Sequence, residues 1–376
     1  MDGFINRPPA STASDGFDKT SQKTEFTFVS DDPSRMIGTP GIIPKARILL
    51  EASKAQGITK QAYLADPSVV FFQSDASDRE WGCGYRNLQM MLSYVVQQQS
   101  SHSVAGRTAR NANSAIPGAI VPTIPELQRQ IEYAWACGFD PPGAEQLKHK
   151  VEGTRKWIGT TEAWCVLCSL GVRCSILDFH TFTGPDRTHP ALLAAIYSYF
   201  RMPAWSPLTA PKSLHMSDFE QAEVDQRIIQ TVKPPLYIQH QGHSRTVIGI
   251  EVLMTGELNL LVLDPRRWLH KSITTLKEAS VSRMRQPAHG SRVTAENGLL
   301  DAQYLLKAFR LSLNFETFKP QYQLLGISGL YHEGQGDDGQ WQPNELELLT
   351  RGTSVSIGWN EDECLQSKSI CSTRIP

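Results

Sequence analysis

One cysteine lies between two glycines and directly before a helical pattern. Cys83 occurs in the stretch Glu80-Trp-Gly-Cys-Gly-Tyr-Arg86. The residues after it place apolar side chains on one helical stripe: Leu88, Met91, Leu92 and Val95. The unpaired N–H groups and the dipole at a helix N-terminus favour thiolate over thiol, and thiolate is the reactive form of cysteine. The pattern predicts a nucleophile; the alternative is a buried cysteine that only fills core space.

A histidine at the start of a strand pattern could supply a base. Residues 237–239 and 245–253 are rich in β-branched and aromatic side chains, which predicts two strands on either side of a short loop. His243 lies at the start of the second strand. A lone histidine is more often a satisfied polar residue than a base, so its role depends on which groups lie near it.

An aspartate ends the next predicted strand. Thr255-Gly256 indicates a turn, and residues 258–263 indicate a buried strand that ends at Asp264, before a proline. A strict two-residue hairpin would pair Asp264 with Val247, which is about 13 Å from His243 at ~3.3 Å per residue. A longer turn or a bulge is therefore expected. A thiol, an imidazole and a carboxylate brought together in this way indicate nucleophilic cysteine catalysis.

Composition limits the classes of protein to consider. The 376 residues are 40% hydrophobic and 20% charged, enough for one substantial core, so we expect one catalytic domain. A formal net charge of -1 gives no basic face for nucleic acid or an anionic membrane, and no apolar run approaches the ~20 residues that span a bilayer. The N-terminal residues lack a signal-peptide pattern, and seven scattered cysteines suit a reducing compartment. These features predict a protein of the cytoplasm or nucleus with free thiols.

The chain divides by composition into three parts. Residues 1–38 predict a disordered arm, residues 39–330 the catalytic domain, and residues 331–376 a mobile tail. Within the domain, residues 42–64 predict a helix, a break at Gly57 and a second short helix, and residues 69–72 a short buried strand. Further helices are expected at 125–136, 160–169, 190–200 and 299–310, strands at 172–179 and 322–327, and loops at 97–117 and 283–298.

Two cysteines with the spacing Cys-x-x-Cys fall inside the helix expected at 160–169. Cys165 and Cys168 could indicate zinc or redox chemistry. A structural role is favoured, because the spacing places both thiols along one helix and no second pair completes a tetrahedral set of ligands. We therefore expect no metal and no other cofactor.

Four motifs, in one order along the chain, resemble the papain-like cysteine peptidases of family C78. They are Trp81-Gly-Cys-Gly-Tyr-Arg86, Gly153-Thr-Arg-Lys-Trp-Ile-Gly159, Gln239-His-Gln-Gly-His-Ser-Arg-Thr246 and Leu263-Asp-Pro265. The resemblance covers about residues 38–330. It implies an α+β fold in which a catalytic helix packs on an antiparallel sheet.

The family has two branches, and this sequence resembles one of them more. In the proteases for the ubiquitin-fold modifier, an Asp-Pro-His tripeptide supplies acid and base, whereas here Asp264-Pro265 is followed by Arg266. The pattern Gln-His-Gln-Gly-His instead resembles the zinc-finger-containing ubiquitin peptidase branch, whose base comes from the upstream strand. By this likeness Cys83 is the nucleophile, His243 the base, Asp264 its orienter and Gln239 an oxyanion donor. That branch carries finger modules, but no cysteine precedes Cys83 in this sequence, so the sequence predicts no particular chain-linkage preference.

The resemblance implies a deubiquitinase that cleaves after the C-terminal Gly-Gly of ubiquitin, on polyubiquitin chains, as a monomer. The alternatives are a protease for another ubiquitin-like modifier and a non-catalytic relative that only binds a modifier. A Gly-Gly tail requires a channel too narrow for ordinary side chains. The expected walls are Trp81, Gly82, Gly84, Tyr85, Trp157, Ile158 and Gly159, with a core aromatic as the alternative for Trp157. Exposed apolar residues within 42–64 are expected to contact the body of the modifier.

Overall fold

The computed structural model describes residues 38–103, 121–203, 206–210, 227–276, 301–312, 319–330, 368–370 and 372–375. Its helices are α1 (Ile42–Ala55), α2 (Cys83–Ser103), α3 (Ile124–Ala136), α4 (Pro141–Gln146), α5 (Thr160–Ser169), the 3-10 turn η1 (Pro185–Arg187), α6 (Pro190–Arg201), α8 (Lys271–Thr274) and α10 (Ala302–Leu306). Its strands are β1 (Thr59–Leu64), β2 (Val172–Phe179), β3 (Ile228–Gln230), β4 (Leu236–His240), β5 (His243–Leu253), β6 (Leu258–Leu263), β7 (Arg310–Ser312), β8 (Tyr322–Leu330) and β9 (Ser372–Ile375).

The described strands form one mixed sheet around the long strand β5. Their order is β3-β1-β5-β4-β8-β2-β9, and β6 pairs with β5 on one side and with β7 on the other. Strand β1 pairs in parallel with β3, and β2 with β9, whereas the other pairings are antiparallel. The predicted α+β fold is confirmed. The predicted antiparallel sheet holds for β4, β5 and β6, the strands that carry the candidate site residues.

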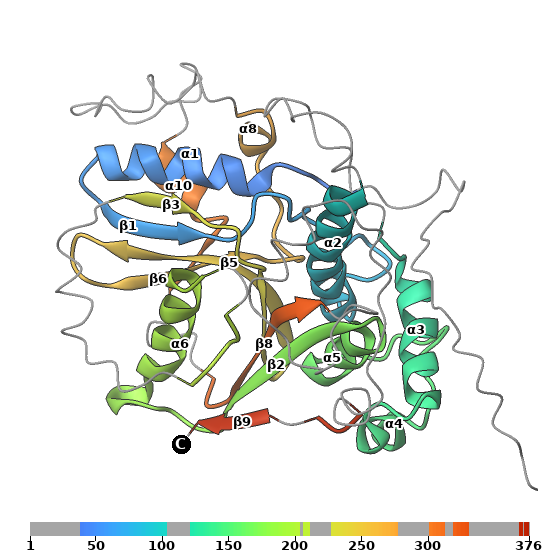
Figure 1. Cartoon of the computed structure of the whole chain (residues 1–376). Coiled ribbons are helices and arrows are strands. Elements are labelled where there is room, and N and C mark those ends of the chain that lie inside the picture. Colours follow the sequence, from blue (N-terminus) through green and yellow to red (C-terminus); the bar gives the residue numbers. More distant parts are fainter. Residues whose placement is uncertain are drawn as a thin grey trace, which may run out of the picture.

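Helix α2 begins at Cys83, as predicted, and packs on β4 and β5. Its predicted apolar stripe faces the core, because Leu88, Met91, Leu92 and Val95 are each at most 1% exposed. Burial of one such side chain contributes roughly 1.5–3 kcal/mol, so the stripe fixes the helix against the sheet. Figure 1 shows α2 and α5 together at one end of the sheet. This packing holds the start of α2, and Cys83 with it, close to β4 and β5.

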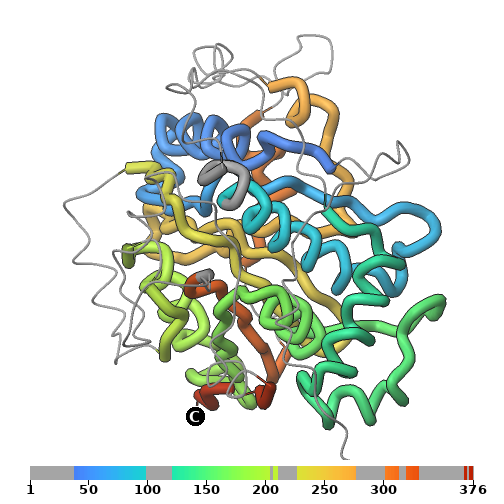
Figure 2. Tube along the Cα trace, turned by 45° about the vertical axis from the view of Figure 1, so that its right-hand side comes forward, coloured from blue at the N-terminus to red at the C-terminus, as the bar shows by residue number. Residues whose placement is uncertain are grey.

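The remaining helices pack around this centre. Helix α1 contacts β1 and β3, α6 contacts β1 and β5, and α3 contacts both α2 and α5. Helix α1 and strand β9 lie at opposite ends of the molecule in both the cartoon and the tube view (Figures 1 and 2). Each helix in the described ranges is either too short or too polar to cross a membrane.

Residues 59–64 form strand β1, so the prediction of a second short helix there is wrong. The strand pairs with β5 on one edge and with β3 on the other, which satisfies its backbone N–H and C=O groups. Both partners lie more than 150 residues later in the chain, so local patterning gave no sign of them.

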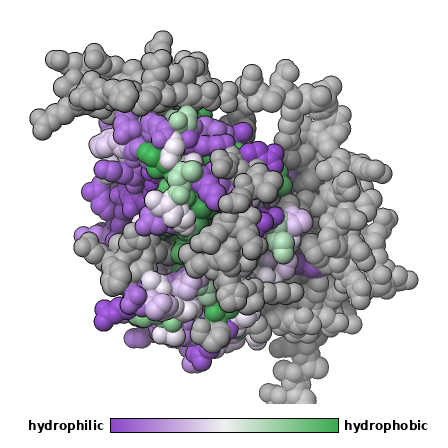
Figure 3. Space-filling model, turned by 90° about the vertical axis from the view of Figure 1, so that its left-hand side faces the viewer, coloured by the Kyte–Doolittle hydropathy of each residue, from purple (hydrophilic) through white to green (hydrophobic). Residues whose placement is uncertain are grey.

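The first helix within 42–64 was correctly expected, but its apolar side chains do not form an exposed surface. Ile42, Ile43, Leu49 and Leu50 are each 0% exposed. On the side of the molecule that Figure 3 shows, the coloured surface is mostly hydrophilic with small scattered hydrophobic spots. The helix therefore lacks the broad exposed apolar face that was expected, although Ile58, just after it, is 37% exposed. Contact of residues 42–64 with a modifier stays a prediction.

Two other element predictions were only partly correct. Residues 69–72 are buried but form no strand; Phe71 makes one isolated bridge with Thr39. The helix expected at 299–310 covers only Ala302–Leu306 among the described residues, and Arg310 begins β7. Two nitrogens of the Arg310 guanidinium donate to the two carboxylate oxygens of the buried Glu251, each at 2.7 Å. This pairing draws residues 310–312 into the sheet beside β6.

Part of the predicted tail belongs to the fold. Strand β9 pairs with β2, and Ile375 is buried against the core. The backbone N–H of Asp140 also donates to the carbonyl of Lys368 at 2.9 Å. The prediction of a mobile tail is therefore wrong for these residues. The predicted arm before residue 38, the loop at 283–298 and the rest of the tail lie outside the described residues.

Candidate active site

Cys83 is the first residue of α2 and is 4% exposed. A buried ion pair fixes the loop before it: Arg86 Nε donates to Asp78 Oδ2 at 2.7 Å. The Asp78 carbonyl accepts from the N–H of Gly82 at 2.6 Å. A Cβ on Gly82 would lie 2.3 Å from the Asp78 carboxylate. Only glycine fits here because Asp78 packs against it, and not because a substrate needs the space.

Both features that the sequence analysis offered as alternatives, a longer turn and a bulge, bring Asp264 towards His243. The turn between β5 and β6 has three residues, because the N–H of Leu253 donates to the carbonyl of Glu257 at 2.8 Å. The register then shifts between Val247 and Gly249. Each device moves Asp264 one residue closer to His243 than a strict hairpin would.

The result is a direct hydrogen bond between the imidazole and the carboxylate. Leu263 pairs with Thr246, so Asp264 follows beside Arg245. The Nε2 atom of His243 lies 2.9 Å from Asp264 Oδ1. Because an ionised carboxylate only accepts, Nε2 carries the proton, and Nδ1 is left free to accept one.

Asp264 is held in the charged form. Its Oδ2 accepts from Arg245 Nε at 2.8 Å, and its Oδ1 also accepts from the N–H of Arg266 at 3.0 Å. Burial raises the pKa of Asp264, but His243, Arg245 and the Arg266 N–H together bring that pKa well below its ordinary value. The carboxylate is therefore charged at neutral pH and stabilises a protonated imidazole.

Arg266, which follows Asp264-Pro265, connects the aspartate to the nucleophile loop. Its Nε donates to the carbonyl of Arg79 at 3.2 Å, and one terminal nitrogen donates to the carbonyl of Glu80 at 3.1 Å. The arginine at this place therefore braces the two loops against each other.

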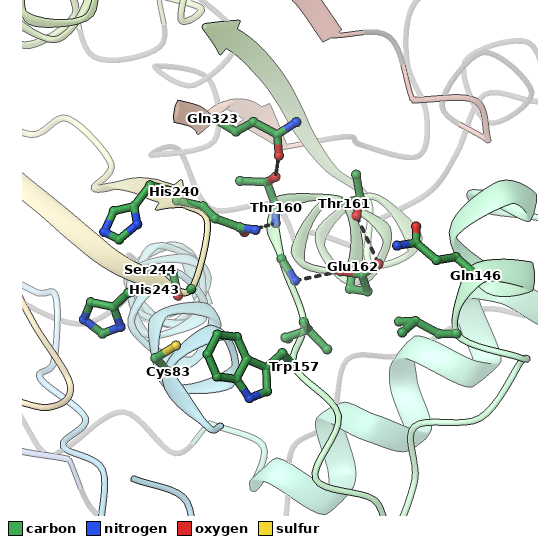
Figure 4. A pocket seen from close by; sticks show the side chains of 15 residues that line it. Cys83, Gln146, Trp157, Thr160, Thr161, Glu162, His240, His243, Ser244 and Gln323 are labelled. Carbon is green, nitrogen blue, oxygen red and sulfur yellow. Dashed lines mark hydrogen bonds between the residues drawn. The ribbon is translucent and has the colours of Figure 1, made fainter. Parts of the chain in front are cut away.

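The thiol of Cys83 lies next to the free side of the His243 ring (Figure 4). Burial raises the pKa of the Cys83 thiol, but the neighbouring His243, with its charge, and Ser244 more than offset this, so the pKa falls to about 7. Burial lowers the pKa of His243, but Asp264 and Cys83 raise it above its ordinary value. These opposite shifts favour transfer of the thiol proton to Nδ1 of the imidazole.

Gln239 is held at the opposite wall of the same cleft by the start of α5. Its Oε1 accepts from the backbone N–H of Thr160 at 2.8 Å. Because that N–H can only donate, the amide oxygen must face it. The two N–H donors of Gln239 Nε2 then lie on the other side of the amide. Such donors can bind a developing oxyanion.

Cys83, His243 and Gln239 line one cleft with a volume of about 220 Å³. Of the expected walls, Trp157, Ile158 and Gly159 line it, and Trp157 is 48% exposed. The sequence analysis missed several other lining residues, which are Gln146, Leu147, Thr160, Thr161, Glu162, His240, Gly242, Ser244 and Gln323. Figure 4 shows Trp157 beside Cys83, which excludes the alternative of a core aromatic.

Four of the expected walls do not line the cleft. These are Trp81, Gly82, Gly84 and Tyr85. A Cβ on Gly84 would lie 2.5 Å from the carbonyl of Ile158, so this glycine allows the loop at 157–159 to approach α2. Tyr85 is fully buried, donates to the carbonyl of Lys156 at 3.2 Å and packs edge-on against Trp81. These residues pack against neighbouring loops or against one another, and do not form the wall of the cleft.

The missed residues divide into those with a sequence signal and those without one. His240 and Ser244 fall inside the motif at 239–246 and could have been noted beside His243. Gln146 comes from α4 and Gln323 from β8, and only tertiary packing brings them to the cleft.

The two cysteines of the Cys-x-x-Cys spacing are buried within α5, Cys165 near its middle and Cys168 in its last turn. The pKa of each is raised, first by burial. In the part of the chain that the structure describes, no group of three or more His, Cys, Asp or Glu side chains is arranged to hold a metal ion.

The chain is similar to a known peptidase family. The model of peptidase family C78 matches residues 58–296. Zinc finger-containing ubiquitin peptidase 1 from Homo sapiens is 42% identical over 194 residues, which is 52% of this chain and 28% of that protein. The chain thus spans well under half of this curated relative.

More distant relatives fall in both branches. Ubiquitin carboxyl-terminal hydrolase mug105 from Schizosaccharomyces pombe is 29% identical over 54% of this chain and 68% of its own length. The probable Ufm1-specific protease 2 of Drosophila melanogaster is 27% identical over 52% of this chain and 23% of its own length. The crystal structure of UfSP from C. elegans covers 72% of this chain and 34% of its own, at 16% identity and a TM-score of 0.33, a likeness too distant to add to the fold assignment.

Proposed function

The chain belongs to peptidase family C78, and on this basis we propose that it is a thiol-dependent deubiquitinase. It hydrolyses the isopeptide or peptide bond after the C-terminal Gly-Gly of ubiquitin, on polyubiquitin chains. The observation that carries the proposal is the contact of His243 with both Asp264 and Cys83 at a cleft that Gln239 also lines. A thiolate, its base, the orienter of that base and an oxyanion donor are the parts that acyl transfer by cysteine requires.

The proposed reaction starts with proton transfer from the Cys83 thiol to Nδ1 of His243, while Asp264 stabilises the imidazolium through Nε2. The sulfur attacks the carbonyl carbon of the terminal glycine. The C–N bond then breaks, and the leaving amine takes the proton from His243. Water next gives one proton to His243 while its oxygen attacks the thioester carbon. The C–S bond breaks and regenerates the Cys83 thiolate, and the carboxylic acid product leaves and loses its proton to solvent.

The proposed oxyanion donors are the Nε2 group of Gln239 and the backbone N–H of Cys83. The carbonyl oxygen gains negative charge while the sulfur loses it, so donors aimed at that oxygen act mainly in the transition state. Helix α5 contributes indirectly, because its Thr160 N–H turns the Gln239 amide so that the N–H donors face the cleft.

The residues that line the cleft together with Cys83 support a Gly-Gly tail as substrate. Trp157 and Ile158 stand on one side of Cys83, and Gly159 lies so close to Gln239 that a Cβ there would be 2.7 Å from its side chain. A glycine pair has no side chains to collide with these walls. We therefore propose Trp157, Ile158 and Gly159 as substrate-binding residues.

A protease for the ubiquitin-fold modifier is the second candidate, because Ufm1-specific proteases are among the relatives. Two observations support ubiquitin instead. The relatives named for ubiquitin have the higher identity over a similar share of the chain. The base comes from β5 and not from the residue after Asp264-Pro265, which is an arginine that braces the nucleophile loop.

A panel of modifiers that carry an electrophile at the C-terminus tests the proposal. The ubiquitin probe is expected to label the full chain covalently at Cys83, and the variant Cys83→Ala is expected to remain unlabelled. Labelling by another modifier alone would assign the protein to that modifier. Reversible association without labelling by any probe would make it a non-catalytic binding relative, and either result would overturn the proposal.

A further inference from the structure

Ser244 occupies a place beside the thiol that the roles above do not use. It follows His243 on β5, is 2% exposed and lines the cleft with Cys83. Strand alternation directs His243 and Arg245 to one side of β5 and Ser244 and Thr246 to the other, where α2 packs. In Figure 4 the Ser244 side chain lies between the His243 strand and Cys83.

Asn87, one turn after Cys83 on α2, determines how the Ser244 hydroxyl is used. Its Nδ2 donates to the carbonyl of Cys83 at 2.8 Å and to Ser244 Oγ at 3.0 Å. Its Oδ1 accepts from the Thr246 hydroxyl at 2.9 Å. A carbonyl can only accept, so the orientation of the amide is fixed, and Ser244 Oγ must act as acceptor towards Asn87. The one proton of the Ser244 hydroxyl therefore points elsewhere.

Two groups could receive that proton, the sulfur of Cys83 and the hydroxyl oxygen of Tyr237. Tyr237 is fully buried, and its hydroxyl makes no hydrogen bond of ordinary geometry within the described ranges, but Ser244 lies close enough to offset part of the rise that burial causes in the pKa of Tyr237. Tyr237 pairs with Thr246, and directly paired residues of two antiparallel strands share one face of the sheet. Ser244 is two residues from Thr246 and lies on that face too. A hydroxyl oxygen has two lone pairs, so Ser244 can accept from Asn87 and from Tyr237 while it donates its proton to sulfur.

We propose that Ser244 is a further catalytic residue, whose hydroxyl donates a hydrogen bond to the Cys83 thiolate, and that Asn87 is its positioning residue. The proposal rests on Cys83 as the nucleophile of the proposed function. The electrostatics agree: the Ser244 hydroxyl and backbone N–H both lower the pKa of the Cys83 thiol, in addition to His243.

The hydrogen bond has its effect before the carbon–sulfur bond forms. It stabilises the thiolate after the thiol proton has moved to His243. During attack the negative charge leaves the sulfur for the carbonyl oxygen, where Gln239 and not Ser244 is the donor. Loss of the Ser244 hydroxyl therefore lowers the fraction of thiolate, a defect that higher pH corrects. Loss of an oxyanion donor would instead lower the rate at every pH.

The test is the rate at which iodoacetamide alkylates Cys83 as a function of pH, resolved by peptide mass spectrometry on the folded full chain. Ser244→Ala is expected to raise the midpoint by about one pH unit, which is about tenfold less thiolate below the midpoint. Cleavage at neutral pH should fall by a similar factor and recover in alkaline buffer. Ser244→Thr, which keeps a hydroxyl, should titrate near the wild type.

A matched control removes another buried hydroxyl. Ser93 also lies on α2, is 0% exposed and donates to the carbonyl of Met90. Ser93→Ala should lower the thermal midpoint of unfolding as Ser244→Ala does, but should leave the alkylation midpoint unchanged. Should Ser244→Ala not fold, Ser244→Gly replaces it, since glycine leaves space for a water to accept from Asn87.

An alkylation midpoint equal to that of the wild type in the folded variant would overturn the role of Ser244, and so would a loss of cleavage that is equal at all pH values. Alkylation requires no modifier, so the result can be read even if ubiquitin is the wrong substrate.

Discussion

The same residue type occupies two helices that pack on one sheet, with opposite chemical results. Cys83 in α2 and Cys165 in α5 are both buried, and burial raises the pKa of both thiols. For Cys83, His243 and Ser244 reverse the effect, and the pKa falls to about 7. For Cys165, the carboxylates of Asp140 and Glu162 add to it, and the pKa rises far above the ordinary value.

The two helix starts explain the difference. Cys83 is the first residue of α2, where N–H groups lack partners in the helix, whereas Cys165 lies in the middle of α5. The start of α5 faces the same cleft but is used otherwise: Thr160 N–H binds Gln239, and Gly159 N–H donates to Glu162 at 2.7 Å. Burial and residue type do not make a nucleophile; the donors and the base around the sulfur do.

The largest difference in cleavage is expected between a variant that removes the thiol of α2 and one that removes a thiol of α5. Cys83→Ala should lower cleavage of a ubiquitin C-terminal amide by at least about 10⁴-fold, because the covalent step is lost. Cys165→Ala should keep cleavage near the wild-type level and lower the free energy of unfolding by about 1–2 kcal/mol. Steady-state kinetics and thermal unfolding check this pair. Full cleavage by Cys83→Ala would show that the sulfur has no role.

The next largest effect on cleavage is expected when the carboxylate that orients the base His243 is removed. In the described part of the chain, Cys165 has no such base beside it. Asp264→Asn should lower kcat/KM by on the order of 10³ to 10⁴-fold, because an amide cannot stabilise the imidazolium and can select the wrong tautomer. The alkylation midpoint of Cys83 should rise at the same time. Arg245 loses its charged partner in this variant, so Arg245→Gln is the control. Its smaller loss of kcat/KM should separate the effect of a broken Arg245–Asp264 ion pair from the effect on the imidazolium.

A smaller and different effect is expected at the oxyanion donor. Gln239→Ala should lower kcat/KM by about 10² to 10³-fold and leave the pH profile of Cys83 alkylation unchanged. Comparison of the two measurements on the same protein separates stabilisation of the oxyanion from stabilisation of the thiolate. A shift of the alkylation midpoint in this variant would mean that Gln239 acts on the sulfur, contrary to the assigned role.

The smallest effect is expected at the wall of the cleft. Trp157→Ala should lower kcat/KM by about tenfold, the size of a single buried contact with substrate. The reactivity of Cys83 towards a small alkylating reagent should stay nearly unchanged, since Trp157 is half exposed and not part of the core. A parallel collapse of alkylation and cleavage would place Trp157 in the scaffold instead.

The sequence was sufficient for the parts of the site that local pattern determines. A helical stripe located the start of α2, and strand patterns located His243 and Asp264. The length of the β5–β6 connection even required a longer turn or a bulge, and both are present.

What the sequence could not supply depends on distant contacts. Residues 59–64 have no strong strand pattern, and only β3 and β5 make them a strand. Gly82 and Gly84 are small because Asp78 and Ile158 pack against them, which no local pattern indicates. Ser244 gains its place beside the sulfur from Asn87, which is 157 residues earlier in the chain.

The most direct test of the account is the pH dependence of alkylation in the wild-type chain, resolved for each cysteine by mass spectrometry. The thiolate reacts and the thiol does not, so a pKa lowered to about 7 means that reactivity is full above that pH and is lost as pH falls below it. We predict a midpoint near pH 7 for Cys83, and no labelling of Cys165 or Cys168 while the protein is folded. A Cys83 midpoint at the ordinary cysteine value, or equal labelling of the α5 thiols, would contradict the account.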